Sequence, residues 1–206
     1  MKLVEIKNIS KIYHTDKNEI KALENISFDI NKGDFIAIVG PSGCGKSTIL
    51  SILCNLENKS SGDIIKKDNI KFGYMFQQDT LFDWLTIEDN CLIGAKINNC
   101  LDDKTINHCS DLLKAYGLDE FKKNYPKELS GGMRQRVALI RTLVLNPNIL
   151  LLDEPFSALD SQSRLKISND VKKILTNEHK TTIMVTHDVS ELIYQINITL
   201  NIYNKP

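Results

Sequence analysis

The feature of this sequence that most constrains its fold is a glycine-rich turn between an apolar run and a helix-forming run. Residues 35–39 (FIAIV) predict a buried strand, and a helix is expected to begin at Lys46. Gly40, Gly45, Lys46 and Ser47 meet the pattern G-x-x-x-x-G-K-S between strand and helix. Backbone N–H groups of such a loop, together with those at the start of the helix, hold phosphate oxygens. The stretch therefore predicts a site for a nucleoside triphosphate.

Two side chains of this loop have distinct expected roles. Lys46 is expected to reach the β- and γ-phosphates, and the Ser47 hydroxyl is expected to bind Mg²⁺. The residues expected to surround the phosphates are Gly40, Pro41, Ser42, Gly43, Cys44, Gly45, Lys46, Ser47 and Thr48.

A second apolar run, residues 149–152, ends in two acidic residues, Asp153 and Glu154. A buried parallel strand delivers such groups to the carboxyl edge of the sheet, where phosphate loops also lie. Asp153 is therefore a candidate Mg²⁺ ligand, directly or through water. Glu154 is the candidate base that polarises the attacking water. A strand that simply ends in two charges is the alternative, which the upstream phosphate loop disfavours.

The composition limits the classes of protein to which the chain can belong. Its 206 residues are enough for one well-buried core with a smaller lobe attached. The 26 basic residues balance the 26 acidic ones, so no general attraction to nucleic acid is expected. No run approaches the ~18 apolar residues of a membrane span, and Glu5 lies where a signal peptide needs an apolar core. Five cysteines without a C-x-x-C pair predict reduced thiols rather than disulfides or zinc.

The pattern of apolar residues predicts a mostly parallel α/β fold. Residues 86–145 have helical spacing and are interpreted as a helical lobe inserted into a β-rich core. Strands elsewhere alternate with helices, which is typical of a parallel sheet. The predicted strands are residues 3–9, 26–30, 35–39, 70–76, 148–152 and 182–185, with a further strand-like run at 196–204.

The stretch Leu129–Arg136 (LSGGMRQR) resembles the signature motif of the ATP-binding cassette (ABC) ATPases. The family's other motifs follow in the expected order: Tyr13, Gln77, Ser157-Ala158-Leu159-Asp160 and His187. The resemblance extends over nearly the whole chain. It implies a single P-loop NTPase cassette over residues 1–206, with a small antiparallel β lobe, a helical subdomain at about 86–145 in a RecA-like core, and a C-terminal tail that is short relative to the family.

Several roles follow from the resemblance alone. Tyr13 is similar to the aromatic residue that stacks on adenine, the alternative being a loosely packed surface tyrosine. Gln77 resembles the glutamine that touches Mg²⁺ and the attacking water. Gln78 leaves an ambiguity of one residue, which alignment on Phe76 resolves in favour of Gln77. The implied ligands are ATP and Mg²⁺, the latter held by Ser47, Gln77 and Asp153.

Other motifs imply a dimer. Ser130, Gly131 and Gly132 begin a helix, and in the family this turn faces the γ-phosphate bound by the other subunit. His187 resembles the residue that senses the γ-phosphate, and Asp160 the residue that links the two sites. The resemblance therefore implies two cassettes that enclose two ATP molecules, most simply as a homodimer.

The residues around Trp84 favour one branch of the family. The stretch 78–86 (QDTLFDWLT) and Met133 are similar to importer ATPases of the nitrate, sulfonate and taurine type, although Asp83 replaces their usual proline. This implies a peripheral subunit at the cytoplasmic face of the membrane, bound to permease subunits and indirectly to an extracytoplasmic solute-binding protein. Trp84 is expected either to contact the permease or to pack inside the helical lobe.

Three other functions remain open. They are the ATPase of an exporter or lipoprotein-extraction system, a soluble ABC protein that acts on ribosomes, DNA or iron–sulfur assembly, and a nucleotide-binding remnant without turnover. The transported solute is not encoded in recognisable residues.

Overall fold

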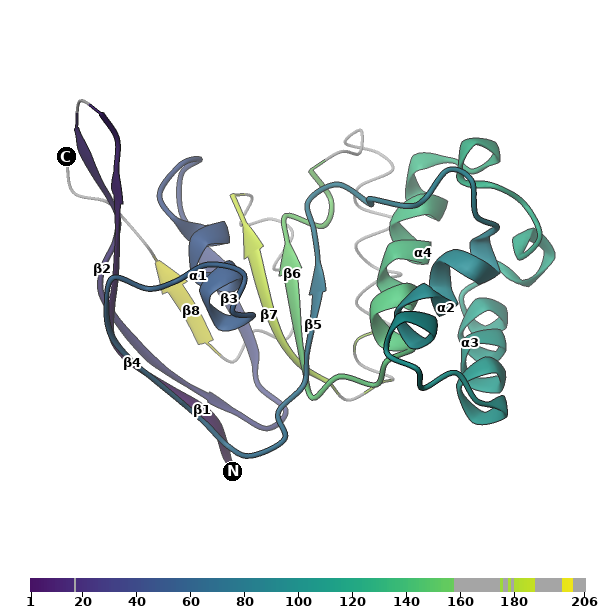
Figure 1. Cartoon of the computed structure of the whole chain (residues 1–206), viewed down its shortest axis with the longest axis horizontal. Helices are drawn as coiled ribbons and strands as arrows, with labels where there is room; N and C mark the ends of the chain where they lie inside the picture. Colours follow the sequence, from purple (N-terminus) through teal and green to yellow (C-terminus); the bar gives the residue numbers. More distant parts are fainter. Residues whose placement is uncertain (17, 158–174, 176–177, 179, 188–197, 202–206) are drawn as a thin grey trace.

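Two β-sheets and a group of helices make up the computed structural model, which describes residues 1–16, 18–157, 175, 178, 180–187 and 198–201 (Figure 1). The strands are β1 Lys2–His14, β2 Glu19–Asn31, β3 Phe35–Val39, β4 Ser61–Lys66, β5 Phe72–Met75, β6 Ile149–Asp153, β7 Thr181–Thr186 and β8 Ile198–Asn201. The helices are α1 Lys46–Leu53, α2 Ile87–Ile97, α3 Asp103–Ala115 and α4 Gly131–Leu143, with short 3₁₀ turns at Asp119–Phe121 and Pro126–Glu128. The three helices α2, α3 and α4 follow β5 and precede β6 in the chain.

The larger sheet is parallel and has the strand order β5-β6-β7-β3-β8. Side chains alternate between its two faces: Ile149 and Leu151 lie in one core, Leu150 and Leu152 in the other. All of β6 is buried, as expected of a strand with helices or strands on both faces. α1 packs on one face of the sheet and α4 on the other.

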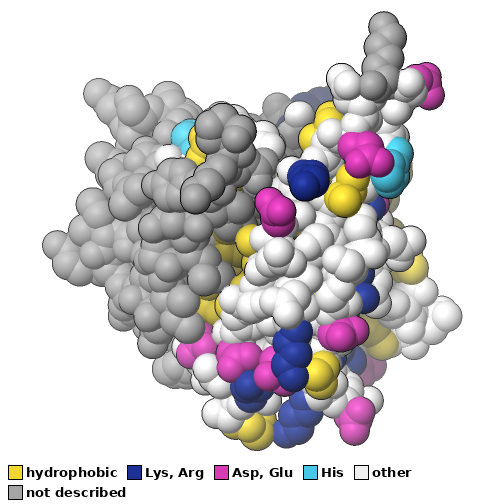
Figure 2. Space-filling model, turned by 90° about the vertical axis from the view of Figure 1, so that its left-hand side faces the viewer, with side chains coloured by type: hydrophobic (Ala, Val, Ile, Leu, Met, Phe, Trp, Pro, Cys, Tyr) yellow, Lys and Arg dark blue, Asp and Glu magenta, His cyan; other side chains and the backbone are white. Residues whose placement is uncertain are grey.

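The smaller sheet is antiparallel, with the order β2-β1-β4. β1 and β2 are longer than predicted, because they continue as a hairpin closed by a turn in which the Asn18 amide donates to Thr15 Oγ1 at 3.0 Å. β4 is not among the predicted strands. Ladder hydrogen bonds need no apolar alternation where both faces are solvated, so the pattern underestimates these lengths. Figure 2, which faces this side of the molecule, shows basic and acidic side chains close to one another on its surface. Lys2 of β1 forms ion pairs with Glu5 and Asp29.

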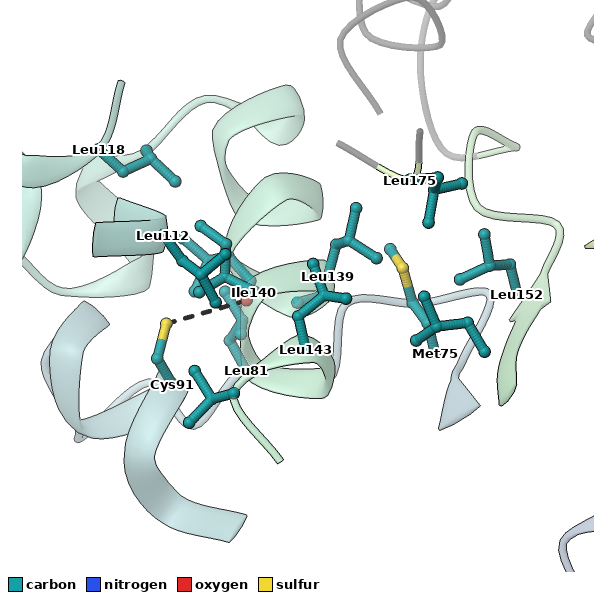
Figure 3. Packing of buried hydrophobic residues seen from close by; sticks show 14 of the residues in the cluster. Met75, Leu81, Cys91, Leu112, Leu118, Leu139, Ile140, Leu143, Leu152 and Leu175 are labelled. Atoms are coloured by element: carbon teal, nitrogen blue, oxygen red, sulfur yellow. Dashed lines mark hydrogen bonds between the residues drawn. The ribbon is translucent and has the colours of Figure 1, made fainter. Parts of the chain in front are cut away.

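A continuous apolar core joins α2, α3 and α4 to the parallel sheet (Figure 3). Leu112 and Leu113 of α3 are buried as the helical spacing predicts, whereas Ile106 is 39% exposed. Cys91 Sγ of α2 lies 4.0 Å from Val137 O of α4. Core residues of α4 thus contact both the other helices and the sheet, so α4 connects α2 and α3 to the parallel sheet.

Candidate functional site

The predicted phosphate loop lies between β3 and α1, where the sequence places it. Lys46 is 4% exposed, and its ammonium group donates to the carbonyls of Gly40 at 2.8 Å and Pro41 at 2.9 Å. Lys46 is the first residue of α1, and these bonds hold its side chain across the phosphate loop. The Ser47 hydroxyl lies on the same turn and is exposed.

Gly45 is the residue that the geometry of this loop requires most strictly. Its φ is +93°, in the left-handed region that favours glycine, and a Cβ there would lie 2.2 Å from the backbone oxygen of Ala22 in β2. The loop is therefore packed directly against the antiparallel sheet. Cys44 beside it is 3% exposed and lies in the core beneath, so this residue can contribute to a phosphate site only through its backbone.

The carboxylate of Asp153 lies at the end of β6, against the phosphate loop. Ser47 Oγ donates to its Oδ1 at 2.8 Å, and Tyr74 of β5 donates its phenol proton to Oδ2 at 3.0 Å. Burial raises the pKa of Asp153, although the hydrogen bonds from Ser47 and Tyr74 act in the opposite direction. Burial likewise raises the pKa of Tyr74, which keeps the phenol protonated and able to donate. Tyr74 is a residue of the site that sequence reasoning missed.

Hydroxyl and carboxylate oxygens at this spacing suit magnesium. Mg²⁺ prefers oxygen ligands and is usually held by one or two protein groups together with substrate phosphates. Ser47 Oγ and Asp153 Oδ1 are such a pair, and they lie beside the loop that would hold the phosphates. The residues present therefore fit this ion.

The Glu154 side chain is the point at which three predicted residues meet. Gln77 Nε2 donates to Glu154 Oε2 at 3.3 Å, and His187 Nδ1 lies 3.2 Å from the same oxygen. Lys46 Nζ lies 3.7 Å from Oε1. The contact is made by Gln77, as the alignment on Phe76 favours. His187 directly after β7, Gln77 after β5 and Lys46 at the start of α1 thus converge on one carboxylate that is 14% exposed.

The backbone of Glu154 is strained. Its φ is +43°, a conformation that costs a non-glycine residue about 1–3 kcal/mol, and its amide donates to Val185 O at 3.0 Å. The sharp turn after β6 brings the carboxylate to the edge of the sheet.

Other predicted residues that the structure describes belong to β1 and to the start of α4. Ser130 caps α4, where its Oγ accepts from the Met133 amide at 3.4 Å, and Gly131 and Gly132 form the first turn. This turn begins α4, which packs on the face of the sheet opposite to that of α1. Tyr13 is half-buried on β1, with Lys11 Nζ 4.7 Å from its ring centroid. Asp160 lies outside the described residues.

Comparison with known proteins identifies the family of the chain. The model of the ABC transporter family matches residues 23–157. The uncharacterized ABC transporter ATP-binding protein YtlC of Bacillus subtilis is 45% identical, over 100% of this chain and 82% of the relative. The aliphatic sulfonates import ATP-binding protein SsuB of Bacillus cereus is 43% identical, over 98% of this chain and 82% of the relative. The nitrate import ATP-binding protein NrtD of Synechocystis is 36% identical, over 93% of this chain and 74% of the relative.

Solved structures give the same result for the fold. The ATP-binding cassette MJ0796, in a dimeric post-hydrolysis state bound to ADP and Pi, superposes with a TM-score of 0.81 at 32% identity, over 98% of this chain and 97% of that one. The prediction of a P-loop fold with a parallel sheet and an antiparallel β lobe is thus confirmed. Given the family match and these relatives, the chain belongs to the ABC transporter family and is an ATP-binding cassette with ATPase function.

Proposed function

We propose that this cassette hydrolyses ATP to power solute uptake by an ABC importer, as a dimer bound to permease subunits at the cytoplasmic face of the membrane. The observation that carries the catalytic part is the convergence of Gln77, Lys46 and His187 on Glu154. The importer part is supported by relatives named for import of aliphatic sulfonates and of nitrate. The dimer is supported by the dimeric form of the structural neighbour. No helix in the described part of the chain is long and apolar enough to cross a membrane, and in this proposal the permease supplies the spans.

In the proposed reaction Glu154 accepts a proton from the water that attacks the γ-phosphate, a contribution of roughly 10²–10⁴ in rate. Gln77 and His187 both contact Oε2, so they fix the orientation of the carboxylate. The phosphate loop binds the triphosphate through backbone amides and Lys46. Ser47 and Asp153 would hold Mg²⁺, which neutralises charge on the β- and γ-phosphate oxygens when bound.

The other proposed contacts complete the composite site. Tyr13 stacks on the adenine of the ATP that is bound by the same chain. Ser130, Gly131 and Gly132 face the γ-phosphate of the ATP that is bound by the second subunit. Asp160 is assigned to the contact between the two sites. Residues 86–145 are proposed as the helical subdomain that moves with the permease.

Trp84 supports the permease contact. Its side chain is 73% exposed, so the alternative that it packs inside the helical lobe is wrong. Its ring lies against Phe82 with the centroids 5.1 Å apart, which makes a small exposed aromatic pair. Aromatic side chains are frequent anchors at protein interfaces.

The catalytic proposal is tested with Glu154→Gln, which keeps the shape of the side chain. ATP binding should persist while steady-state hydrolysis falls by at least about 100-fold. The matched control is Glu24→Gln, since Glu24 is an exposed carboxylate paired only loosely with Lys21 at 4.0 Å. Undiminished turnover in Glu154→Gln would remove Glu154 as the base. For the importer, tagged Glu154→Gln protein should capture a multispanning membrane protein from detergent-solubilised cells with ATP present, and purely soluble partners would contradict it.

A further inference from the structure

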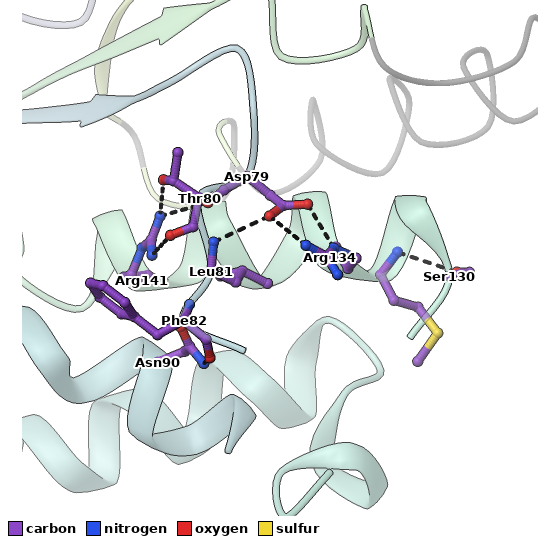
Figure 4. A network of polar contacts seen from close by, with 9 residues as sticks. Asp79, Thr80, Leu81, Phe82, Asn90, Ser130, Arg134 and Arg141 are labelled. Atoms are coloured by element: carbon purple, nitrogen blue, oxygen red, sulfur yellow. Dashed lines mark hydrogen bonds and ion pairs between the residues drawn. The ribbon is translucent and has the colours of Figure 1, made fainter. Parts of the chain in front are cut away.

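An ion pair joins the segment that contains Gln77 to the first turns of α4 (Figure 4). Residues 77–86, here called the glutamine segment, follow β5 and precede α2. Arg134 Nε donates to Asp79 Oδ2 at 2.7 Å and its Nη2 donates to Oδ1 at 3.0 Å. The two bonds form the parallel, two-pronged arrangement that gives an arginine–carboxylate pair both strength and fixed geometry.

This pair differs from an ordinary surface ion pair. The Asp79 side chain is 18% exposed and that of Arg134 is 28% exposed. Oδ1 of Asp79 also accepts from the amide of Leu81 at 3.2 Å, which fixes the carboxylate from its own side. Burial raises the pKa of Asp79, but the hydrogen bonds from Arg134 and Leu81 outweigh it and hold the pKa below the usual value. The carboxylate is therefore charged and oriented near neutral pH.

A second arginine of α4 holds the next residue of the segment. Arg141 donates to Thr80 O at 2.9 Å, to Thr80 Oγ1 at 3.0 Å and to Asp79 O at 2.7 Å. Thr80 has φ +46°, which is unusual for a β-branched residue, and the guanidinium group accounts for its persistence. Arg134 and Arg141 are about two helical turns apart on the same side of α4. The segment is thus bound along α4 at two points.

The pair connects two parts of the proposed machinery. Two residues before Asp79, Gln77 contacts Glu154 of the same chain's site. One turn before Arg134, Ser130 caps the turn proposed to face the other subunit's nucleotide. A helix and a short, doubly bonded segment transmit displacement with little loss because their internal geometry is fixed. The Asp79–Arg134 pair is the link between Gln77 and α4 that lies nearest to the Ser130 turn, whereas Arg141 binds the segment about two turns further along the helix.

We infer that Asp79 and Arg134 are positioning residues that fix the Ser130–Gly132 turn relative to Gln77. The position of one chain's catalytic carboxylate is thereby coupled to the binding of the other chain's nucleotide. The inference rests on the proposed function, because it needs the composite site of a dimer. It adds two residues that touch neither nucleotide nor permease in that proposal.

The test separates nucleotide binding from ATP-driven dimerisation. Asp79→Asn, Arg134→Gln and the double variant are made in the Glu154→Gln background, and Asn keeps the oxygen that accepts from Leu81. Dimerisation with ATP and Mg²⁺ is measured by analytical ultracentrifugation, and nucleotide affinity by a fluorescent ATP analogue on dilute monomer. The control is Lys96→Gln, which breaks the exposed 2.7 Å pair between Lys96 and Asp89 in the same helical region.

Each single variant should weaken dimerisation about tenfold while nucleotide affinity stays within about twofold of the parent. The double variant should lose no more than the more strongly affected single variant, since each single change weakens the same interaction. Arg134→Lys should dimerise more weakly than the parent but more strongly than Arg134→Gln, because a lysine keeps the charge but loses the two-pronged geometry. Dimerisation equal to that of Lys96→Gln, additive losses, or a parallel loss of nucleotide affinity would each overturn the inference. If the Glu154→Gln parent itself stays monomeric, the composite site of the proposed function fails, and the inference fails with it.

Discussion

Asn90 offers a quantitative test of how the glutamine segment is held. Its side chain is fully buried in α2: Oδ1 accepts from the Phe82 amide at 2.8 Å, and Nδ2 donates to the carbonyls of Phe82, Leu85 and Thr86 at 3.0, 3.1 and 3.0 Å. When the Asn90 side chain is removed, two of these three carbonyls still accept a hydrogen bond from another donor. Leu85 N still bonds Phe82 O, and the Asn90 amide still bonds Thr86 O. Asn90→Ala therefore takes a partner from four groups but leaves two of them, the Phe82 N–H and the Leu85 carbonyl, without the partner that they have in the parent.

The expected cost follows from that count. A donor or acceptor left without a partner costs about 1–3 kcal/mol when buried, and less where water reaches it. Phe82 and Leu85 are half-buried, so the lower half of this range applies to each. Asn90→Ala should then lower the free energy of unfolding by about 2–4 kcal/mol, including the lost packing of the amide. Much of the loss should be local, since the bonds hold the segment rather than the sheet.

The assay is urea denaturation followed by far-ultraviolet circular dichroism. Asn98→Ala is the matched control, because Asn98 ends the same helix, is exposed, and makes one side-chain bond to Gly94 O at 2.8 Å. That variant should change the free energy of unfolding by no more than about 0.5 kcal/mol. The reasoning is refuted if the two variants are destabilised equally.

Three further changes have defined outcomes. Gly45→Ala should abolish nucleotide binding, because the new Cβ would lie 2.2 Å from a backbone oxygen. Gly43→Ala should only weaken binding, because Gly43 has φ +81° but open space around it. Equal effects of the two variants in a nucleotide titration would contradict this. Tyr74→Phe leaves one oxygen of Asp153 without its donor and should lower the free energy of unfolding by about 1 kcal/mol, whereas no change in urea denaturation would show that water replaces the phenol. Since the pKa of Asp79 is lowered in the folded chain, the stability it contributes is complete above about pH 4 and is lost as the pH falls through the folded value. The difference in stability between the parent and Asp79→Asn should therefore shrink as the pH falls below about pH 4, and a constant difference would refute it.

Local patterns were sufficient to predict the centre of the fold. The phosphate loop, its strand and its helix lie where glycine spacing and apolar runs place them, because these features act over a few residues. Asp153 closes β6 for the same reason. The hairpin of β1 and β2 extends beyond the predicted strands because backbone pairing alone holds its solvated end.

Contacts between distant residues were beyond such reasoning. Asp79 and Arg134 are separated by 55 positions, and no sequence pattern predicts that the two side chains form a pair. Tyr74 reads as an ordinary strand residue, although its phenol reaches Asp153 from the neighbouring strand. Such pairs depend on how elements pack, and packing is decided by the whole chain.

The exposed Trp84 gives the chain an intrinsic optical probe. It is the single tryptophan of the sequence, so the indole emission of the protein arises from one position in the glutamine segment. An indole that is 73% exposed already emits as it would in water, so unfolding should shift the spectrum little. Burial of the ring by a docked subunit should instead shift the emission to shorter wavelength. A blue shift of this emission would therefore report the docking proposed for Trp84 when the added partner segment contains no tryptophan of its own.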